Sequence, residues 1–284
     1  MSRIAYVDGQ YLPHRSAGVH IEDRGYQFAD GVYEVLAAVG GHLVDEGPHL
    51  ARLARSLSEL RIAAPMSEAA LGIVMREVVR RNGVRDGALY LQVTRGTAPR
   101  DHAFPQSAKP VLVVTARRRK PADPRLASDG IAVITIPDIR WRRCDIKSVA
   151  LVANVLGKQQ AREAGAYEAW QVDGDGRVTE GTSTNAWIVT ADGAAVTRQA
   201  DSAILNGVTR LAVFDIIRRE GHRLVERPFT VAEAKAAREA FVTSTAVELL
   251  PVVRIDGNPV GDGKPGPLST ALRAFYLAHA AKAA

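Results

Sequence analysis

Lys147 occupies an unusual place for a lysine. The polar segment 140–146 precedes it, and the apolar run 149–153 follows it with a pattern that predicts a buried helix. A lysine held among apolar residues loses its charge and becomes an amine nucleophile, which is the condition for Schiff-base chemistry. The alternative is a lysine at a helix start whose ammonium group extends into water.

Glu180 is the first candidate partner for Lys147. It lies in the polar segment 176–185, where a short strand runs into turn-forming residues and then into a second strand. A carboxylate beside a pyridine nitrogen keeps that nitrogen protonated, and a protonated ring is the electron sink that pyridoxal phosphate chemistry requires. A solvated glutamate in an ordinary loop is the alternative.

A phosphate-bearing cofactor also needs anion-binding groups, and two segments offer them. Asn206 or Gly207 opens a predicted amphipathic helix, so that the amides of Val208 and Thr209 would be free donors at its positive end. The second segment is 242–246, where a strand ends in a hydroxyl-rich turn. An ordinary helix cap and an ordinary strand end remain the alternatives.

Arg52 is a further candidate for the anion site. It lies on the side of its predicted helix opposite the stripe of Leu50, Leu53 and Leu57, and its forked guanidinium suits a phosphate. A solvated helix arginine would show the same spacing.

The elements that must position these residues read as a mixture of helices and strands. Four Asp-Gly pairs, which begin at residues 8, 173, 192 and 256, are hairpin signals. Strands are predicted over 110–115, 131–136, 186–190 and 240–244 in antiparallel sheet, with amphipathic helices around 50–60 and 208–216. The prediction is an α+β fold of two domains, 1–120 and 125–284, divided at the proline-containing segment 120–125.

Composition excludes several classes of protein. The 284 residues are 46% hydrophobic and 24% charged, as in folded globular proteins. No apolar stretch reaches the roughly 20 residues that cross a bilayer, and the first residues do not resemble a signal peptide, so we expect a cytoplasmic location and no membrane partner. A single cysteine excludes an internal disulfide and a multi-cysteine metal site.

The net charge of +6 does not by itself indicate a nucleic-acid partner. The basic clusters at 117–120 and 140–143 are short, separated and without interleaved aromatic residues for stacking on bases. We therefore expect no nucleic-acid partner and interpret the basic character as suited to small anions.

Taken in order, these segments resemble the class IV pyridoxal phosphate aminotransferases of fold type IV along nearly the whole chain. The matching segments are 28–35, 49–53, the Lys147 segment, 179–185, 205–210 and 244–251. The resemblance implies an active site in the cleft between the two domains, with the lysine and most cofactor contacts in the C-terminal one. It assigns the Schiff base and proton transfer to Lys147, the pyridine nitrogen to Glu180, and the remaining contacts with cofactor to Arg52, Leu205, Val208, Thr209, Ser244 and Thr245.

The segment 94–102 resembles the D-amino acid aminotransferases in particular. There the resemblance implies that Arg100 and His102, together with Tyr33, hold the α-carboxylate of the substrate. A guanidinium fork, a histidine and a phenol suit that role. The expected reaction is amino transfer between a D-amino acid, such as D-alanine or D-glutamate, and a 2-oxo acid, pyruvate or 2-oxoglutarate.

Other reactions of the same class are alternatives at this stage. They are transamination of branched-chain L-amino acids or of (R)-amines, and the aminodeoxychorismate lyase reaction. The resemblance also implies a homodimer. Arg142 and Arg143 are not expected from it, and if they faced the pocket they would favour acidic D-amino acids.

Overall fold

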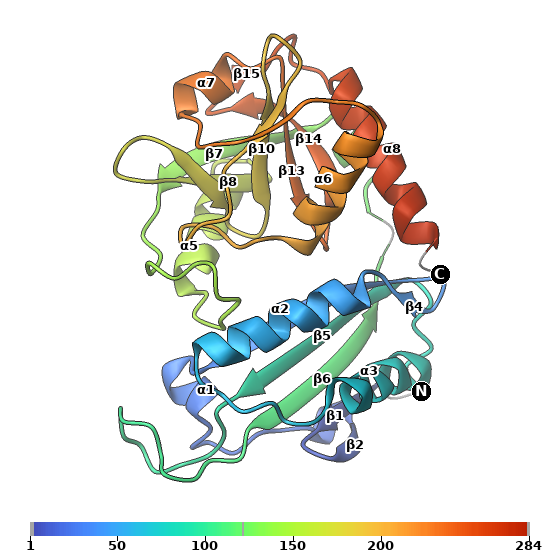
Figure 1. Cartoon of the computed structure of the whole chain (residues 1–284), viewed down its shortest axis with the longest axis vertical. Helices are drawn as coiled ribbons and strands as arrows, with labels where there is room; N and C mark the ends of the chain where they lie inside the picture. The colour runs from blue at the N-terminus through green and yellow to red at the C-terminus, as the bar shows by residue number, and fades with distance from the viewer. Residues whose placement is uncertain (1–2, 121, 283–284) are drawn as a thin grey trace. The chain divides into compact units, whose positions relative to one another are not determined.

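A computed structural model describes residues 3–120 and 122–282 of the chain (Figure 1). The described residues divide into two compact units. The first contains residues 3–120, 146–150 and 280–282, and the second contains residues 122–145 and 151–279. Residues 146–150 therefore group with the N-terminal unit, although they follow the predicted boundary in sequence.

The N-terminal unit is built on a six-stranded antiparallel sheet in the order β2-β1-β6-β5-β3-β4. In β3 and β5 buried and partly exposed residues alternate, so that one face turns toward the hydrophobic core. Helix α2 packs on β3, and α3 packs on β6 and β1. The elements are β1 (Ile4–Val7), β2 (Gln10–Pro13), a 3-10 helix (His14–Ser16), α1 (Arg24–Phe28), β3 (Gly31–Val39), β4 (His42–Leu43), α2 (Glu46–Glu59), α3 (Glu68–Arg81), β5 (Gly87–Thr94) and β6 (Val111–Arg118).

The C-terminal unit is built on a nine-stranded sheet in the order β12-β11-β10-β13-β14-β7-β8-β9, with β15 on β14. Strands β9 and β10 are buried along their whole length. Helix α5 packs on β7 and β8, and α6 packs on β13 and β12. The strands are β7 (Ile131–Pro137), β8 (Glu168–Val172), β9 (Val178–Gly181), β10 (Asn185–Val189), β11 (Ala195–Thr197), β12 (Leu224–Glu226), β13 (Glu239–Ser244), β14 (Glu248–Ile255) and β15 (Asn258–Pro259). The helices are α4 (Arg125–Ser128), α5 (Val152–Glu163), α6 (Val208–Arg219), α7 (Val231–Lys235) and α8 (Pro267–Lys282).

The predicted strands and hairpins are present. All four Asp-Gly pairs connect antiparallel neighbours: β1 with β2, β8 with β9, β10 with β11, and β14 with β15. At residues 8–9 and 256–257 both members have positive φ, which matches the twist of a two-residue hairpin. The antiparallel prediction is wrong for part of the C-terminal sheet, because β14 with β7, β7 with β8, and β11 with β12 are parallel. The chain between the members of these pairs includes helices α5 and α6, which allow parallel connections.

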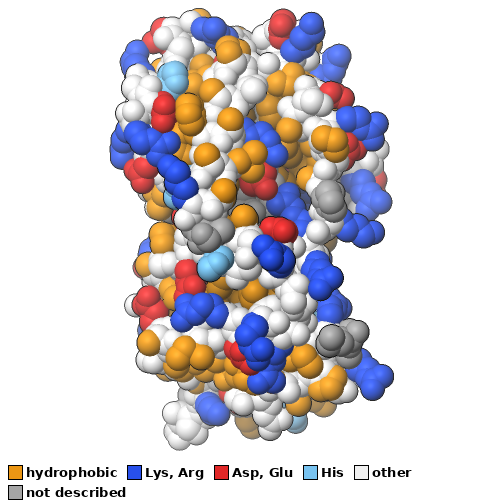
Figure 2. All heavy atoms as spheres, turned by 90° about the vertical axis from the view of Figure 1, so that its right-hand side faces the viewer, with side chains coloured by type: hydrophobic (Ala, Val, Ile, Leu, Met, Phe, Trp, Pro, Cys, Tyr) orange, Lys and Arg blue, Asp and Glu red, His pale blue; other side chains and the backbone are white. Residues whose placement is uncertain are grey.

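On the face shown in Figure 2, lysine and arginine side chains alternate with hydrophobic and acidic ones. Within residues 3–120 and 122–282, no helix is long and apolar enough to cross a membrane.

Candidate functional site

The Lys147 segment lies beside strand β3 in the N-terminal unit. The Tyr33 amide donates to the Lys147 carbonyl at 3.0 Å, and Ser148 forms an antiparallel bridge with Val32. The Lys147 amide in turn donates to the Ser56 hydroxyl of α2 at 3.3 Å. Strand β3 therefore holds the Lys147 backbone at its carbonyl, and helix α2 holds it at its amide.

The prediction of a buried helix directly after Lys147 is wrong. Residues 146–150 are not helical, and α5 begins only at Val152. The pairing with β3 keeps the backbone of this segment out of a helix, which overrides the helical pattern of its side chains. Within α5 the side chains of Val152, Val155 and Leu156 are exposed rather than buried.

The amine of Lys147 lies over an aromatic ring. Its Nζ atom is 4.2 Å from the centroid of the Tyr33 ring, and that ring stacks on Tyr90 with centroids 5.6 Å apart. Burial, with a smaller contribution from Tyr33, raises the pKa of Tyr90 to about 12, so its phenol stays neutral and donates to Gln92 at 2.7 Å. One side of the Lys147 amine thus faces the Tyr33 ring.

Arg52 of α2 is paired with a carboxylate that sequence reasoning gave no role. Its Nε and Nη2 atoms donate to the two oxygens of Glu34 on β3, each at 2.8 Å, and His49 Nδ1 lies 2.8 Å from the same carboxylate. Burial acts to raise the pKa of Glu34, but the hydrogen bonds from Arg52 and His49 outweigh it and lower that pKa to about 2. Arg52 is therefore a held side chain and not a solvated one.

Arg100 and His102 lie on the exposed loop between β5 and β6, against Phe28 of α1. The Arg100 guanidinium carbon is 5.0 Å from the Phe28 ring centroid, and the His102 ring is 5.3 Å from it. Among residues 3–120, no hydrogen bond or ring contact joins Tyr33 to either side chain. The three residues expected to hold one carboxylate are thus not gathered by contacts within the described chain.

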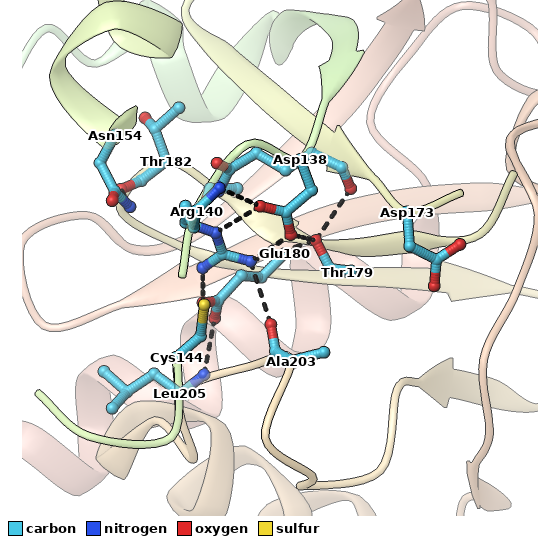
Figure 3. A network of polar contacts seen from close by, with 12 residues as sticks. Asp138, Arg140, Cys144, Asn154, Asp173, Thr179, Glu180, Thr182, Ala203 and Leu205 are labelled. Carbon is cyan, nitrogen blue, oxygen red and sulfur yellow. Dashed lines mark hydrogen bonds and ion pairs between the residues drawn. The ribbon is translucent and has the colours of Figure 1, made fainter. Parts of the chain in front are cut away.

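Glu180 is buried at the end of β9 in the C-terminal unit, contrary to the solvated alternative. Figure 3 shows its carboxylate beside Arg140, with which it forms an ion pair. Its other oxygen accepts from Asn185 Nδ2 at 3.0 Å and from the Leu205 amide at 3.1 Å. The Asn185 amide also donates to the Leu205 carbonyl at 2.9 Å, so Asn185 links the Glu180 carboxylate to the segment before α6.

Arg140 connects Glu180 to a second carboxylate, that of Asp138. Its Nη2 and Nε atoms donate to the Asp138 oxygens at 2.7 and 2.9 Å, and Nη2 also reaches the Thr179 hydroxyl and the Ala203 carbonyl (Figure 3). Burial acts to lower the pKa of Arg140, but its carboxylate partners outweigh burial and raise it, so the guanidinium stays charged. With two carboxylates and one guanidinium, the three ionisable side chains carry one net negative charge.

Sequence reasoning placed Arg140 in a basic cluster and missed its role. The available signal was Asp138 two residues earlier, directly after a predicted strand, but a pair at that spacing is common on surfaces. Arg143 of the same cluster pairs with Asp145 at 3.0 Å, and Arg142 is exposed.

Burial raises the pKa of the Cys144 thiol to about 12, so the thiol stays protonated.

Both predicted anion-binding segments have the expected local structure. Helix α6 begins at Val208 after the N-cap Gly207, and no side chain caps it. A Cβ atom on Gly207 would lie 2.2 Å from Asn185 Oδ1, so this close approach requires glycine. The amides of the first turn, including those of Val208 and Thr209, lack intrahelical acceptors and form the positive end of the helix.

Ser244 and Thr245 stand where β13 ends. The Ser244 hydroxyl is buried, and the described residues offer it no hydrogen-bond partner. The neighbouring Thr243 hydroxyl accepts from Trp187 Nε1 at 3.0 Å. A buried polar atom without a partner costs free energy, which is expected where a ligand completes the site.

A family model described as amino-transferase class IV matches residues 31–255. The chain is 43% identical over 280 residues to the D-alanine aminotransferase of Bacillus licheniformis, with 97% of this chain and 98% of that protein covered. It is 42% identical over 270 residues to the D-alanine aminotransferase of Staphylococcus haemolyticus, with 94% of each covered.

Solved structures agree in fold. The T.th. branched-chain amino acid aminotransferase with pyridoxamine 5'-phosphate has a TM-score of 0.90 and 27% identity, and 99% of this chain and 95% of that chain are covered. The Escherichia coli branched-chain enzyme has a TM-score of 0.92 at 21% identity, with 100% and 96% covered, and shows the fold alone. The predicted α+β fold is confirmed.

Proposed function

The chain belongs to the class IV aminotransferase family, as its sequence predicted, and we propose that it transfers amino groups between D-amino acids and 2-oxo acids with pyridoxal 5'-phosphate as cofactor. The reaction is supported by identity of about 40% to D-alanine aminotransferases over nearly the full chain. In the structure itself, the observation that carries the proposal is the buried Glu180 carboxylate with its ion pair to Arg140.

The residues of the C-terminal unit fit the cofactor. A protonated pyridine nitrogen would compensate the net negative charge of Asp138, Arg140 and Glu180. A phosphate dianion suits the uncapped start of α6 and the unpartnered Ser244 hydroxyl. When bound, pyridoxal phosphate supplies an aldehyde that captures amines and a ring that withdraws electrons from the carbon attached to the amine.

Glu180 keeps the ring nitrogen protonated in this proposal. A carboxylate that stays ionised beside a pyridine favours the cationic ring, and Arg140 holds Glu180 ionised by direct charge pairing. Asn185 and the Leu205 amide fix the orientation of the second oxygen, so the carboxylate is ordered before cofactor arrives. We propose Leu205 as a further contact for the ring.

We propose that the phosphate is held by Val208, Thr209, Ser244, Thr245 and Arg52. The first two offer backbone amides at a helix start, and the hydroxyl pair follows the end of β13. Arg52 is already fixed by Glu34, which orders its guanidinium and lowers the entropy lost when it binds an anion.

Lys147 is proposed to bind the cofactor aldehyde and to move the substrate proton. Its amine lies over the Tyr33 ring, and its backbone is held by β3 at the carbonyl and by Ser56 of α2 at the amide. Because Tyr33 is its immediate neighbour, a substrate carboxylate held near Tyr33 would lie beside the amine. Arg100 and His102 are proposed to complete that carboxylate site.

We further propose a homodimer. The exposed apolar face of α5, formed by Val152, Val155 and Leu156, supports it, since exposed apolar faces of this kind mark contact surfaces. A second copy also offers a source of Arg100 and His102 for a site that contains Tyr33. The cytoplasmic location stays a prediction from the sequence.

A donor panel tests the proposed reaction. D-alanine, D-glutamate, L-leucine and (R)-phenylethylamine are compared as amino donors to 2-oxoglutarate, with pyruvate as the acceptor for D-glutamate. The proposal expects the two D-amino acids to react fastest. A preference for L-leucine or the amine would overturn it, and so would release of aminobenzoate from aminodeoxychorismate without amino transfer.

A further inference from the structure

The loop that carries Arg100 and His102 is exposed, yet a buried arginine of α1 anchors it. Arg24 is only 3% exposed. Its Nη1 donates to the Asp101 carbonyl at 2.6 Å, and its Nη2 donates to the His102 carbonyl at 3.5 Å. One guanidinium therefore contacts the backbone at two successive residues of the proposed carboxylate-binding loop.

The same loop is fixed through side chains by one aromatic ring. Phe28 has the Arg24 guanidinium carbon at 4.8 Å, the Arg100 guanidinium carbon at 5.0 Å and the His102 ring at 5.3 Å from its centroid. Contacts between a guanidinium and an aromatic face are directional, so Phe28 restricts the orientation of Arg100 as well as its position. Both side chains proposed to bind carboxylate thus share a single support.

Helix α1 is itself held rigidly, which makes it a suitable support. Arg24 Nε donates to Asp30 Oδ2 at 2.8 Å, and Asp23 caps the helix by accepting from the Gly25 amide at 2.8 Å. Asp23 also accepts from the Thr94 hydroxyl of β5 at 2.7 Å. The helix is therefore tied to the sheet by two carboxylates on either side of Arg24.

The charge of Arg24 is balanced inside this cluster. Asp30 also pairs with Arg95, whose Nε lies 2.7 Å from Oδ2. Burial acts to raise the pKa of Asp30, but hydrogen bonds from Arg95 and Arg24 outweigh it and lower that pKa. Arg95 donates its remaining hydrogen bonds to the carbonyls of Leu60 and Arg61, at 2.7 and 2.9 Å. Of these two arginines, Arg24 is the one that reaches the Asp101 and His102 backbone.

We propose that Arg24 and Phe28 are positioning residues that set the affinity for the α-carboxylate of both substrates by holding Arg100 and His102. The inference rests on the proposed function, because it takes Arg100 and His102 as carboxylate-binding groups. Amino acid and 2-oxo acid carry the same α-carboxylate, so a displaced loop weakens binding of both.

The test is steady-state kinetics of holoenzyme variants with D-alanine and 2-oxoglutarate. Arg24→Met and Phe28→Leu are expected to raise KM for both substrates in parallel, by roughly 10- to 100-fold, because small displacements of positioning groups have effects of that order. The kcat is expected to change only a few-fold. Arg24→Lys keeps the charge but loses the fork, so its KM should lie between those of wild type and Arg24→Met.

Two controls separate positioning from a general loss of structure. Arg76→Met removes a surface ion pair with Glu46, at 2.6 Å in the same unit, and should leave KM unchanged. Amide hydrogen exchange should rise in loop 97–109 of Arg24→Met and stay as in wild type in strands β3 and β5. A variant that loses cofactor and kcat while KM stays constant would indicate a structural role and overturn the inference.

The two proposals fail differently. If wild type accepts D-alanine but Arg24→Met and Phe28→Leu keep the wild-type KM for both substrates, only the positioning role is wrong. If wild type does not accept D-alanine, the proposed function fails and the positioning role fails with it.

Discussion

Glu180 and Arg140 form an ion pair in which both side chains are less than one-tenth exposed. Asp138 holds the other edge of the guanidinium at 2.7 Å. The two carboxylates and one guanidinium together leave one negative charge, and a buried charge is stable only when it has a counterpart. In our account that counterpart is the protonated ring of the cofactor.

Arg140→Met tests this charge balance. Without the guanidinium, the buried Glu180 carboxyl loses the cation that favours its ionised form, so it takes up a proton and the ring nitrogen loses its charged partner. Wild type is expected to bind pyridoxal phosphate more tightly than an analogue with carbon in place of the ring nitrogen. Arg140→Met should lose that difference. Arg143→Met, which breaks a half-exposed pair with Asp145, is the control and should keep it.

Ser244→Ala tests the phosphate site. The hydroxyl is buried and has no partner among the described residues, so its removal should not lower the free energy of unfolding of the apoprotein. Cofactor affinity should fall about 10- to 100-fold, since a hydrogen bond to a charged group contributes roughly 1.5–3 kcal/mol. Thr243→Val is the matched change on the same strand. It leaves Trp187 Nε1 unpaired, so it should lower stability, with cofactor affinity much less affected. Equal affinities in wild type and Ser244→Ala would remove Ser244 from the site.

Glu34 gives the protein a specific dependence of stability on pH. Its folded pKa of about 2 lies below its ordinary value of 4.5, so its contribution is complete above pH 4.5 and is lost as the pH falls toward 2. The difference between these pKa values corresponds to about 3 kcal/mol at neutral pH. Burial lowers the pKa of His49 by more than its hydrogen bond with Glu34 raises it. The folded protein therefore favours neutral His49, and the free energy of unfolding decreases as the pH falls below 6.5.

Glu34→Gln should therefore lower the free energy of unfolding at pH 7, and its deficit relative to wild type should shrink between pH 4.5 and 2. Glu77→Gln is the control. The Glu77 pKa is also lowered to about 2, by hydrogen bonds from Arg80 and Arg81, but that carboxylate lies at the surface, where water screens the pairs. Chemical denaturation across pH measures both variants, and equal effects would contradict the assignment to the buried cluster.

Val155→Asp tests the proposed dimer. A carboxylate in the centre of the exposed apolar face of α5 should weaken self-association, because a charge buried in an interface must lose its hydration. Sedimentation velocity is expected to show a dimer for wild type and monomer for the variant at the same concentration. A wild-type monomer would contradict the proposal, whereas a dimeric variant would place the interface elsewhere.

The local elements that carry the proposed cofactor residues followed largely from the sequence. The strands and Asp-Gly hairpins are short-range patterns, so residues 8–9 and 256–257 could be assigned from neighbours alone. The segments around Glu180 and Val208 likewise combine a strand or helix with turn residues beside it. Such features depend on backbone angles and periodicity, which the sequence encodes locally.

Contacts between distant segments were not predictable from spacing. The hydrogen bond between Lys147 and Tyr33 depends on which segment lies beside β3. The ion pair of Arg52 with Glu34 depends on how α2 packs on that strand. The same holds for Arg140, because its two carboxylate partners, Asp138 and Glu180, lie 2 and 40 residues away in the sequence. A buried arginine has the same sequence signature as an exposed one, so its role appears only when the sheet brings its partners together.

The most direct test of the central claim is the half-reaction of wild-type holoenzyme with one equivalent of D-alanine or L-alanine, without any acceptor. Absorbance follows the cofactor, and released pyruvate is counted. We expect D-alanine to convert the bound cofactor to its pyridoxamine form with one pyruvate per site. We expect L-alanine to react far more slowly, and Lys147→Ala to release no pyruvate from D-alanine. Equal conversion by both enantiomers, or full conversion by Lys147→Ala, would contradict the central claim.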